Sequence, residues 1–359
     1  MNLLMFNLAV DAEHVTLAFG LRWIEELAKR FDHIDVVTMC ERTHQLPSNV
    51  KVWSVGRERG YPKWFRVLRF YWLLARVWRE RPPRVAFSHM IPLFSIFFSP
   101  VARLTGCPSI LWYAHGATPR TLRLAHHLVD RVVTSTQQGF RLRSEKVSVI
   151  GQGIDLDLFP YQRRTSGLVF RVVTVGRLAP SKGQDVLISA LNDWRPADDR
   201  PWKLTIVGDA TSDSERVFAD KVRRQAQAVS APNRVEFTGR LPPSDIAGHL
   251  READVFVSLG TTGSLDKAIV EAMASGCPVI SCNDAFTALA AAGGFANCVI
   301  GNDERAIRVG LANYLALDQH QRDQIAERQA LVAKTDHGLN GLVDKLSSIL
   351  YDAAEGSAP

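Results

Sequence analysis

A strand-to-helix turn near the middle of the chain carries two cations and two glycines. An apolar run at residues 172–175 is followed by Gly176 and Arg177, and Lys182 and Gly183 come shortly after. Glycine permits a tight turn and a close approach of ligand to backbone. Arginine offers a phosphate two parallel donors, and lysine offers it a mobile point charge. The turn therefore favours binding of a diphosphate, although two solvated cations beside a loop would give the same pattern.

A second turn of this kind follows the apolar run 255–258. Its loop, residues 260–265, consists of small residues and one leucine, and it leads into a helix predicted from Asp266 with Ser264 as N-cap. Free amides at such a helix start can bind a phosphate. Glu271 follows on an otherwise apolar helix, where a carboxylate is costly unless it is paired or bound to a group such as a ribose hydroxyl. A partly exposed helix glutamate is the alternative.

The elements that must position these turns alternate along the whole chain. Short apolar runs and amphipathic segments of helical period predict parallel sheets with helices on both faces. A polar segment at 161–167 suits a linker between two such halves. We therefore expect a domain at 1–161, a second at 162–335, and a helix at 336–359 that packs back on the first domain and ends in a disordered tail.

Composition limits the functions that are open to the chain. It has 359 residues, 46% of them hydrophobic and 22% charged, which suits two globular domains. Five scattered cysteines form no metal-binding pattern and indicate reduced thiols in the cytosol. No signal peptide is recognised, and the longest apolar stretch, 85–101, contains prolines and a histidine that argue against a spanning helix. The net charge of +6 requires an anionic partner: nucleic acid, acidic lipid or a phosphorylated substrate.

Four segments in order resemble one known family. They are Gly176-Arg177 with Lys182-Gly183, then residues 206–209 (IVGD), 237–239 (FTG) and 271–279 (EAMASGCPV). This series is similar to the nucleotide-sugar domain of the retaining glycosyltransferases of family 4. The resemblance covers essentially the whole chain, in outline only over the first third. It implies the GT-B fold, in which two Rossmann-like, doubly wound domains face each other across a cleft.

The resemblance also implies roles for individual residues. Arg177 and Lys182 would hold the donor diphosphate beside Gly176, and Glu271 would bind the ribose. The loop of Gly239, Arg240 and Leu241 would face the base. The donor side is completed by Ser264, Leu265, Asp266, Lys267 and Gly153. Family members usually carry a further glutamate eight residues before Glu271, where this chain has Gly263. If the family's pattern applies, recognition of the sugar would shift to Asp266 or Lys267.

The first half offers candidates for the acceptor side and for catalysis. His115 ends a predicted strand, at the place where the family has a histidine that reaches the sugar from the opposite domain. A structural histidine is the alternative. The first loop lacks the family's paired glycines and instead carries Asp11, Glu13 and His14, which can contact an acceptor hydroxyl or simply begin a solvated helix.

The segment from Tyr61 to Arg81 mixes basic and aromatic residues. On a helical wheel one face holds four arginines with aromatic and aliphatic neighbours: Arg66, Arg69, Arg76, Arg79, Phe65, Trp72 and Leu73. Such a face suits the surface of an anionic bilayer and would imply a lipid-linked acceptor. A domain helix with a buried apolar stripe is the alternative.

These observations predict a retaining glycosyltransferase that needs neither metal nor cofactor. It would move a sugar from a UDP- or GDP-linked donor to a glycan or polyprenyl-linked acceptor, in cell-envelope polysaccharide assembly. It would work in the cytoplasm, on the inner face of the cell membrane if the basic helix binds there. A sugar-nucleotide epimerase of the same fold and a catalytically silent sugar-nucleotide-binding partner are alternatives. A nucleic-acid binder is disfavoured because no recognised motif accompanies the basic residues.

Overall fold

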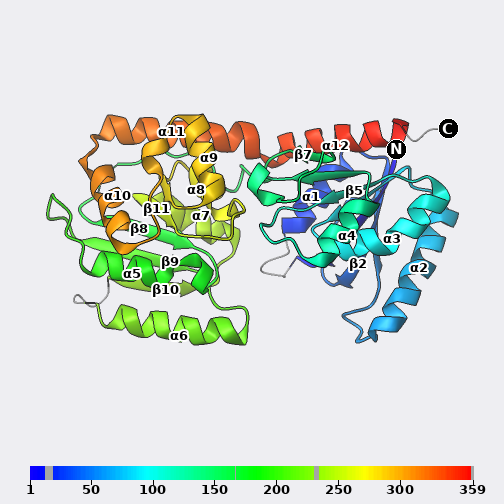
Figure 1. The fold of residues 1–359 in the computed structure, drawn as a ribbon, viewed down its shortest axis with the longest axis horizontal. Coiled ribbons are helices and arrows are strands. Elements are labelled where there is room, and N and C mark those ends of the chain that lie inside the picture. The colour runs from blue at the N-terminus through cyan, green and yellow to red at the C-terminus, as the bar shows by residue number, and fades with distance from the viewer. Residues whose placement is uncertain (13–18, 166, 230–233, 357–359) are drawn as a thin grey trace. The chain divides into compact units, whose positions relative to one another are not determined.

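The chain folds into two compact units (Figure 1). The computed structural model describes residues 1–12, 19–165, 167–229 and 234–356. The first unit comprises Met1–Gly153 and the chain from Leu339 onward, and the second comprises Ile154–Gly338. These divisions lie eight residues before, and three residues after, the two boundaries expected at 161 and 335. The predicted linker at 161–167 falls inside the second unit, where Arg164 donates to the carbonyls of Leu250 and Gly276.

The first unit contains a seven-stranded parallel sheet in the order β3-β2-β1-β4-β5-β6-β7. Its strands are β1 (Asn2–Val10), β2 (His33–Glu41), β3 (Val50–Ser54), β4 (Val85–His89), β5 (Ser109–Trp112), β6 (Arg131–Thr134) and β7 (Val147–Val149). Its helices are α1 (Phe19–Ala28), α2 (Lys63–Glu80), α3 (Pro92–Thr105), α4 (Arg120–Leu128) and α12 (Leu339–Gly356), with the short η1 (Gln137–Gly139). Successive strands of the sheet are joined by crossover connections, as parallel pairing requires.

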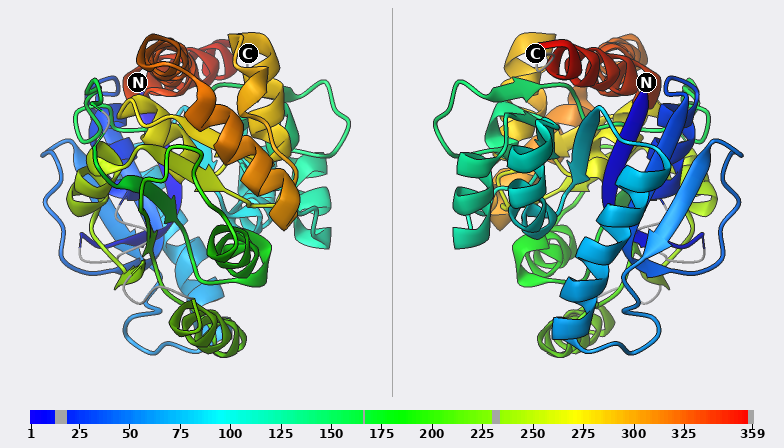
Figure 2. Two further views of the ribbon diagram at one scale, coloured as in Figure 1. Left: turned by 90° about the vertical axis from the view of Figure 1, so that its left-hand side faces the viewer. Right: turned by 90° about the vertical axis from the view of Figure 1, so that its right-hand side faces the viewer.

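Both faces of this sheet are covered because its strands are apolar on both sides. Along β1, Leu3 and Met5 join the core formed with α1 and α12, whereas Leu4 and Phe6 join the core formed with α2 and α3. The right-hand view of Figure 2 shows α2 crossing one face of the strands. Successive side chains of a strand point to opposite faces, which explains this division.

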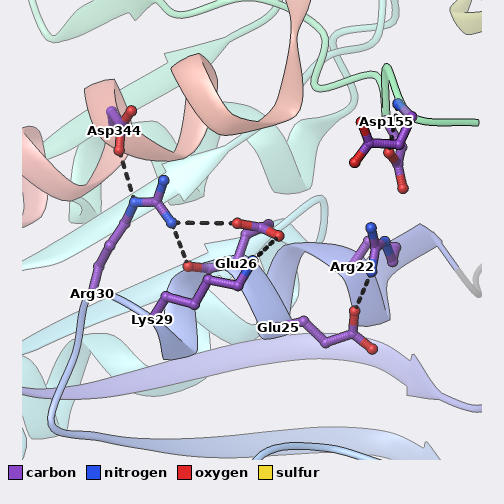
Figure 3. A network of polar contacts seen from close by, with 8 residues as sticks. Arg22, Glu25, Glu26, Lys29, Arg30, Asp155 and Asp344 are labelled. Carbon is purple, nitrogen blue, oxygen red and sulfur yellow. Dashed lines mark hydrogen bonds and ion pairs between the residues drawn. The ribbon is translucent and has the colours of Figure 1, made fainter. Parts of the chain in front are cut away.

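The last helix, α12, belongs to the first unit although the chain reaches it from the second. Leu342, Leu346 and Leu350 are buried in the core that α1 shares. Arg30 donates from Nε to Asp344 of α12 at 2.8 Å and from Nη1 to the backbone oxygen of Glu26 at 2.7 Å (Figure 3). The terminal helix is thus fixed by an apolar face and a charged edge.

The second unit contains a five-stranded parallel sheet in the order β10-β9-β8-β11-β12. Its strands are β8 (Phe170–Val175), β9 (Trp202–Val207), β10 (Val235–Gly239), β11 (Val255–Ser258) and β12 (Val279–Ser281). Its helices are α5 (Gln184–Asn192), α6 (Asp213–Gln227), α7 (Pro243–Glu252), α8 (Lys267–Ala274), α9 (Asp284–Gly293), α10 (Glu304–Ala316) and α11 (Gln319–His337), with the short η2 (Pro180–Lys182) and η3 (Ala296–Cys298). The order is that of a doubly wound sheet, whose direction of winding reverses between β8 and β11.

Helix α2 departs in part from the predicted face. Leu73, expected among the arginines, is buried with Phe70, Leu74 and Val77 against the sheet. The exposed side of the helix instead carries Trp64, Leu68, Tyr71 and Trp72. The prediction that Leu73 lies on the face of the arginines was wrong. Residue spacing alone does not determine which side of a helix packs against the sheet. None of the helices in the described ranges has the length and apolar character to cross a membrane.

His89 is a buried member of the first unit's core. It is 3% exposed, and its ring centroid lies 4.7 Å from that of Trp23. Burial lowers the pKa of His89 from 6.5 to about 4, because the interior disfavours the charged ring. Between these two pH values the unfolded chain binds a proton that the folded chain does not. The folded state therefore loses stability as pH falls from 6.5 to 4.

We expect this histidine to contribute a stability loss of about 2 kcal/mol between pH 7.5 and pH 5. Urea unfolding of the protein and of His89→Phe at both pH values measures it. The variant should show a smaller loss than the parent, since phenylalanine does not titrate. An equal loss in both proteins would contradict the assignment.

Candidate functional site

The two glycine-bearing turns, one with Arg177 and Lys182 and the other at 260–265, lie side by side in the second unit. One follows β8 and the other follows β11, and these strands are neighbours in the sheet. The backbone N–H of Thr261 in the second turn donates to the carbonyl of Ser181 in the first, at 3.2 Å. Both turns leave the carboxyl ends of their strands where the winding reverses, which is the position at which open α/β sheets bind ligands.

Lys182 joins the two turns directly. Its Nζ lies 2.6 Å from Oδ1 of Asp266, and both side chains are less than one-fifth exposed. Gly183 begins α5 with a φ of 65°, and a Cβ there would lie 2.9 Å from Cβ of Leu259. The first turn can therefore pack against β11 only with a glycine at this position. This packing places Lys182 beside Asp266, the residue that precedes the first helical residue of α8.

Arg177 is held by an acid that the sequence analysis did not single out. Its Nη1 pairs with Oε1 of Glu215 on α6, while Gln184 donates to its backbone oxygen at 2.8 Å. The backbone N–H of Thr211 donates to the same carboxylate at 2.7 Å. Burial alone would raise the pKa of Glu215, but the hydrogen bonds from Thr211 and the charge of Arg177 outweigh it and lower that pKa. The guanidinium stays half exposed and keeps donors for a ligand.

The helix after β11 begins later than predicted. Asp266, not Ser264, is the N-cap of α8, and the first helical residue is Lys267. The buried amide of Asn283 donates to the carbonyls of Gly260 and Ser264, at 3.1 and 2.9 Å, and so holds the loop in a non-helical conformation. The carboxylate of Asp266 pairs with Lys182 and caps no helical amide. The Ser264 prediction was wrong because it ignored this tertiary contact.

Glu271 lies on α8 and is 6% exposed. Its Oε1 lies 3.3 Å from Nζ of Lys267, one turn earlier on the helix. An i,i+4 pair compensates only part of the cost of a buried carboxylate. The helix thus presents one acid and one base side by side at its amino end, next to the contact between Lys182 and Asp266.

A backbone crossing brings the third expected loop to the same edge. Gly208, after β9, donates its N–H to the carbonyl of Gly239 at 2.7 Å, and Gly176 donates to Val207 at 2.9 Å. A Cβ on Gly208 would lie 2.0 Å from the carbonyl oxygen of Gly176. Arg240 reaches the carbonyl of Ala210 through Nη2 at 2.5 Å. The ends of four adjacent strands therefore converge.

The other residues expected on the donor side have packing or backbone roles in the structure. Leu241 is partly buried against the second unit's core, and Leu265 is buried within it. Gly263 has a φ of 77°, a conformation that glycine adopts at low cost. Gly153 belongs to the first unit, where a Cβ would lie 3.0 Å from the Trp23 ring. That contact gives Gly153 a packing role there.

The candidates for the acceptor side and for catalysis lie in the first unit. His115 is exposed after β5; its Nδ1 accepts a hydrogen bond from the N–H of Ala117 at 3.0 Å. Neutral His115 therefore carries its proton on Nε2. Asp11 is buried at the end of β1, at the same edge of the sheet. Glu13 and His14 lie outside the described residues.

Two residues of the site were missed by sequence reasoning. Glu215 is remote from Arg177 in sequence, and only folding brings them together. Asn283 follows β12 and is the N-cap of α9, accepting hydrogen bonds from Ala285 and Phe286. Its position between a strand and a helix is a recognisable N-cap signal. No local sequence pattern predicts the hydrogen bonds that Asn283 donates to Gly260 and Ser264.

Comparison with known proteins agrees with this geometry. Residues 169–315 match the family described as glycosyl transferases group 1. The D-inositol 3-phosphate glycosyltransferase of Corynebacterium glutamicum is 28% identical over 222 residues, which cover 58% of this chain and 52% of that protein. The GDP-mannose-dependent alpha-(1-6)-phosphatidylinositol monomannoside mannosyltransferase of Mycobacterium tuberculosis is 29% identical over 216 residues, covering 52% and 54%. The chain thus spans about half the length of the curated relatives it matches.

A solved structure supports the fold over nearly the whole chain. The HepE protein of Anabaena, in complex with UDP, matches with a TM-score of 0.76 at 18% identity, covering 98% of this chain and 100% of that one. At this identity the likeness establishes the fold alone. The chain has the GT-B fold of two Rossmann-like α/β units, and its residues 169–315 match the model of the glycosyl transferases group 1 family.

Proposed function

We propose that this protein is a retaining glycosyltransferase that uses a UDP- or GDP-linked sugar and needs no metal. The observation that carries the proposal is the contact between Lys182 and Asp266, which joins two turns where the winding of the second sheet reverses. With Arg177, this places two cations at the edge that binds ligands in such folds. The named relatives and the UDP complex of the Anabaena protein support the donor class.

In the proposed reaction the two cations stabilise the departing diphosphate. Lys182 exchanges Asp266 for a phosphate oxygen, and the half-exposed guanidinium of Arg177 donates to the other phosphate while Glu215 holds it in place. Fixed positive charge aimed at a leaving group lowers the barrier of transfer without the reorganisation that water requires. These residues then supply the charge that metal ions supply in other transferases.

Glu271 is proposed to bind the ribose hydroxyls of the donor. A carboxylate that is 6% exposed and has its lysine partner at 3.3 Å retains acceptor capacity for such hydroxyls. Gly239, Arg240 and Leu241 are proposed to face the base, since their loop joins the same edge through Gly208. The donor then extends across the ends of adjacent strands.

Recognition of the sugar is proposed to fall to Asp266 and Lys267, since Gly263 offers no side chain. Asp266, released from Lys182 when the phosphate binds, becomes an acceptor for sugar hydroxyls. His115 is proposed to contact the transferring sugar through Nε2, and Asp11 to contact the acceptor. Binding of both substrates would align the reacting atoms.

The acceptor is proposed to be a glycan or polyprenyl-linked chain in cell-envelope polysaccharide assembly, made at the inner face of the membrane. Helix α2 supports contact with an anionic bilayer, because its exposed side carries Trp64, Leu68 and Trp72. The Trp72 ring is flanked by Arg69 and Arg76, at 5.7 and 5.1 Å from its centroid. Such mixed basic and aromatic surfaces bind anionic lipid interfaces.

A thermal-shift screen with UDP, GDP and ADP tests the donor site. We expect one of these, at 100 times its Kd, to raise the melting temperature by about 5 °C or more, since only the folded state binds it. The matching nucleoside, which lacks phosphates, should give a much smaller shift. Equal shifts from diphosphate and nucleoside would contradict the roles of Arg177 and Lys182. Product analysis by mass spectrometry, with donor alone and with polyprenyl-linked acceptors, then separates a transferase from an epimerase.

A further inference from the structure

A pocket in the first unit shares no residue with the candidate donor site. Its volume is about 480 Å³, within the range of sites that bind small organic molecules. It is bounded by the end of β2, the turn after β3, and the first turns of α2 and α3. Its lining residues are Met39, Val55, Arg57, Lys63, Arg66, Val67, Phe70, Leu93, Phe94 and Phe97.

The position of this pocket favours a ligand. Parallel strands carry their ligands at the carboxyl edge of the sheet. Met39 lies near the carboxyl end of β2, and Val55 directly follows β3. Asp11, the proposed acceptor-side residue, follows β1 at the same edge. The pocket therefore opens on the side of the first unit where an acceptor would be held.

The wall of the pocket is apolar and aromatic. Phe70 and Phe94 are 3% and 2% exposed and form its buried side, and Phe97 and Val67 are partly buried beside them. Leu93, which is 37% exposed, stands at its open side. Hydrocarbon in such a space is removed from water on all but one side, which is strongly favourable.

The charged residues of the lining are all basic. Arg57 and Lys63 are exposed, Arg66 is half-buried, and within the described ranges none of the three forms an ion pair. The Nε of Arg66 is buried and lacks a hydrogen-bond partner there. A buried guanidinium donor left unpaired is costly, so an acceptor group bound beside Arg66 would be favoured. The Oε1 of Glu58, one residue after Arg57, is contacted by Ser54 and Arg59, while its Oε2 is buried without a hydrogen-bond partner among the described residues.

Two helix starts add to this positive field. Both α2 and α3 begin at the pocket, and neither has a side-chain cap or an acidic residue in its first turn. By contrast, α6 and α10 of the second unit have capping side chains and acids in their first turns. Helix starts carry partial positive charge that favours anions. The pocket thus combines an apolar interior with an anion-attracting mouth.

We infer that this pocket binds the lipid-phosphate end of the acceptor, with the hydrocarbon chain among the phenylalanines and the phosphate on Arg66, Arg57 and Lys63. The inference rests on the proposed function, because it names the acceptor class of that reaction. It differs from adhesion of α2 to a bilayer, in which the exposed Trp64, Leu68 and Trp72 would insert and the pocket would stay empty.

Calorimetry with octyl phosphate below its micelle concentration tests the inference on the full chain. Octyl phosphate should bind at least about tenfold more tightly than either inorganic phosphate or octanol, since both ends of the ligand contribute. Arg66→Gln and Leu93→Glu should each weaken it about tenfold or more. Arg79→Gln, on the same helix as Arg66, and Leu104→Glu, at an 87% exposed position on the same helix as Leu93, should leave it unchanged.

The outcomes separate this inference from its rivals. Equal affinity in all four variants would mean adventitious binding of the amphiphile and would overturn it. Binding to phosphatidylglycerol vesicles without binding of octyl phosphate would reduce α2 to a surface anchor and would also overturn it. The nucleoside-diphosphate screen probes the other unit. Octyl phosphate binding without any nucleotide shift would therefore remove the proposed reaction while leaving the lipid-phosphate site.

Discussion

Replacing Lys182 with alanine is expected to weaken binding of the nucleotide-sugar donor by about 10- to 150-fold, the equivalent of one charge-assisted hydrogen bond. Sugar transfer should fall by about 100-fold or more, because the lysine also stabilises charge that develops as the diphosphate leaves. The loss has a second cause in this fold. Without the ammonium group, the carboxylate of Asp266 would remain at the proposed phosphate position and repel the ligand.

Lys221→Ala is the matched control for this experiment. Lys221 belongs to the same unit and also pairs with an aspartate, Asp185, at 3.3 Å, but it is 63% exposed on α6. Its removal should change neither donor affinity nor transfer. Lys221→Ala should unfold within about 1 kcal/mol of the parent, since the lysine of its pair is exposed. Lys182→Ala should remain folded with a larger loss of stability, since it leaves the carboxylate of Asp266 mostly buried and unpaired. Transfer at the parent rate by a folded Lys182→Ala would remove the lysine from the mechanism.

Gly208→Ala is expected to destabilise the second unit by about 3 kcal/mol or more. The added Cβ would lie 2.0 Å from the carbonyl oxygen of Gly176, and that neighbour is backbone, which cannot rotate away. The φ of 127° adds strain for any residue with a side chain. Relief requires β8 and β9 to separate at their carboxyl ends, which would also displace the turn that carries Arg177 and Lys182. Urea unfolding monitored by circular dichroism measures the loss.

Gly248→Ala provides the comparison for the same change of side chain. Gly248 lies within α7 of the same unit, and a Cβ there would meet nothing within 4 Å. Alanine costs less entropy than glycine in a helix, so this variant should gain up to about 1 kcal/mol. A Gly208→Ala protein as stable as the parent would show that the crossing of β8 and β9 tolerates a side chain.

The fold was largely predictable because its signals are local and repeated. The expected alternation of strands and helices is present, since a fully buried parallel strand is a short apolar run and the intervening amphipathic segments form helices. The positions at which the chain divides into two units were harder to predict from the sequence. The chain passes between units at Ile154, whose N–H donates to the carbonyl of His337 at 2.8 Å. A pairing between residues so far apart leaves no mark on local composition.

The loops of the candidate site could be predicted from the sequence, but the ion pairs that hold its two cations could not. Glycines at 176, 183 and 208 mark turns, and the structure explains two of them by contacts that a Cβ would make. The partners of the two cations, Glu215 and Asp266, could not be assigned from spacing. The start of α8 was misplaced for the same reason: the amide of Asn283 decides it from another strand.

The sequence by itself determined the alternation of strands and helices, the resemblance of the second unit to a known family and the two turns for which we propose a diphosphate, because each of these depends on neighbouring residues. Only the tertiary structure decided that Lys182 meets Asp266, that Arg66 faces a pocket and that Leu73 faces the core. Those outcomes depend on which side of each element is buried. Burial is settled when distant segments pack together, and a linear pattern does not record it.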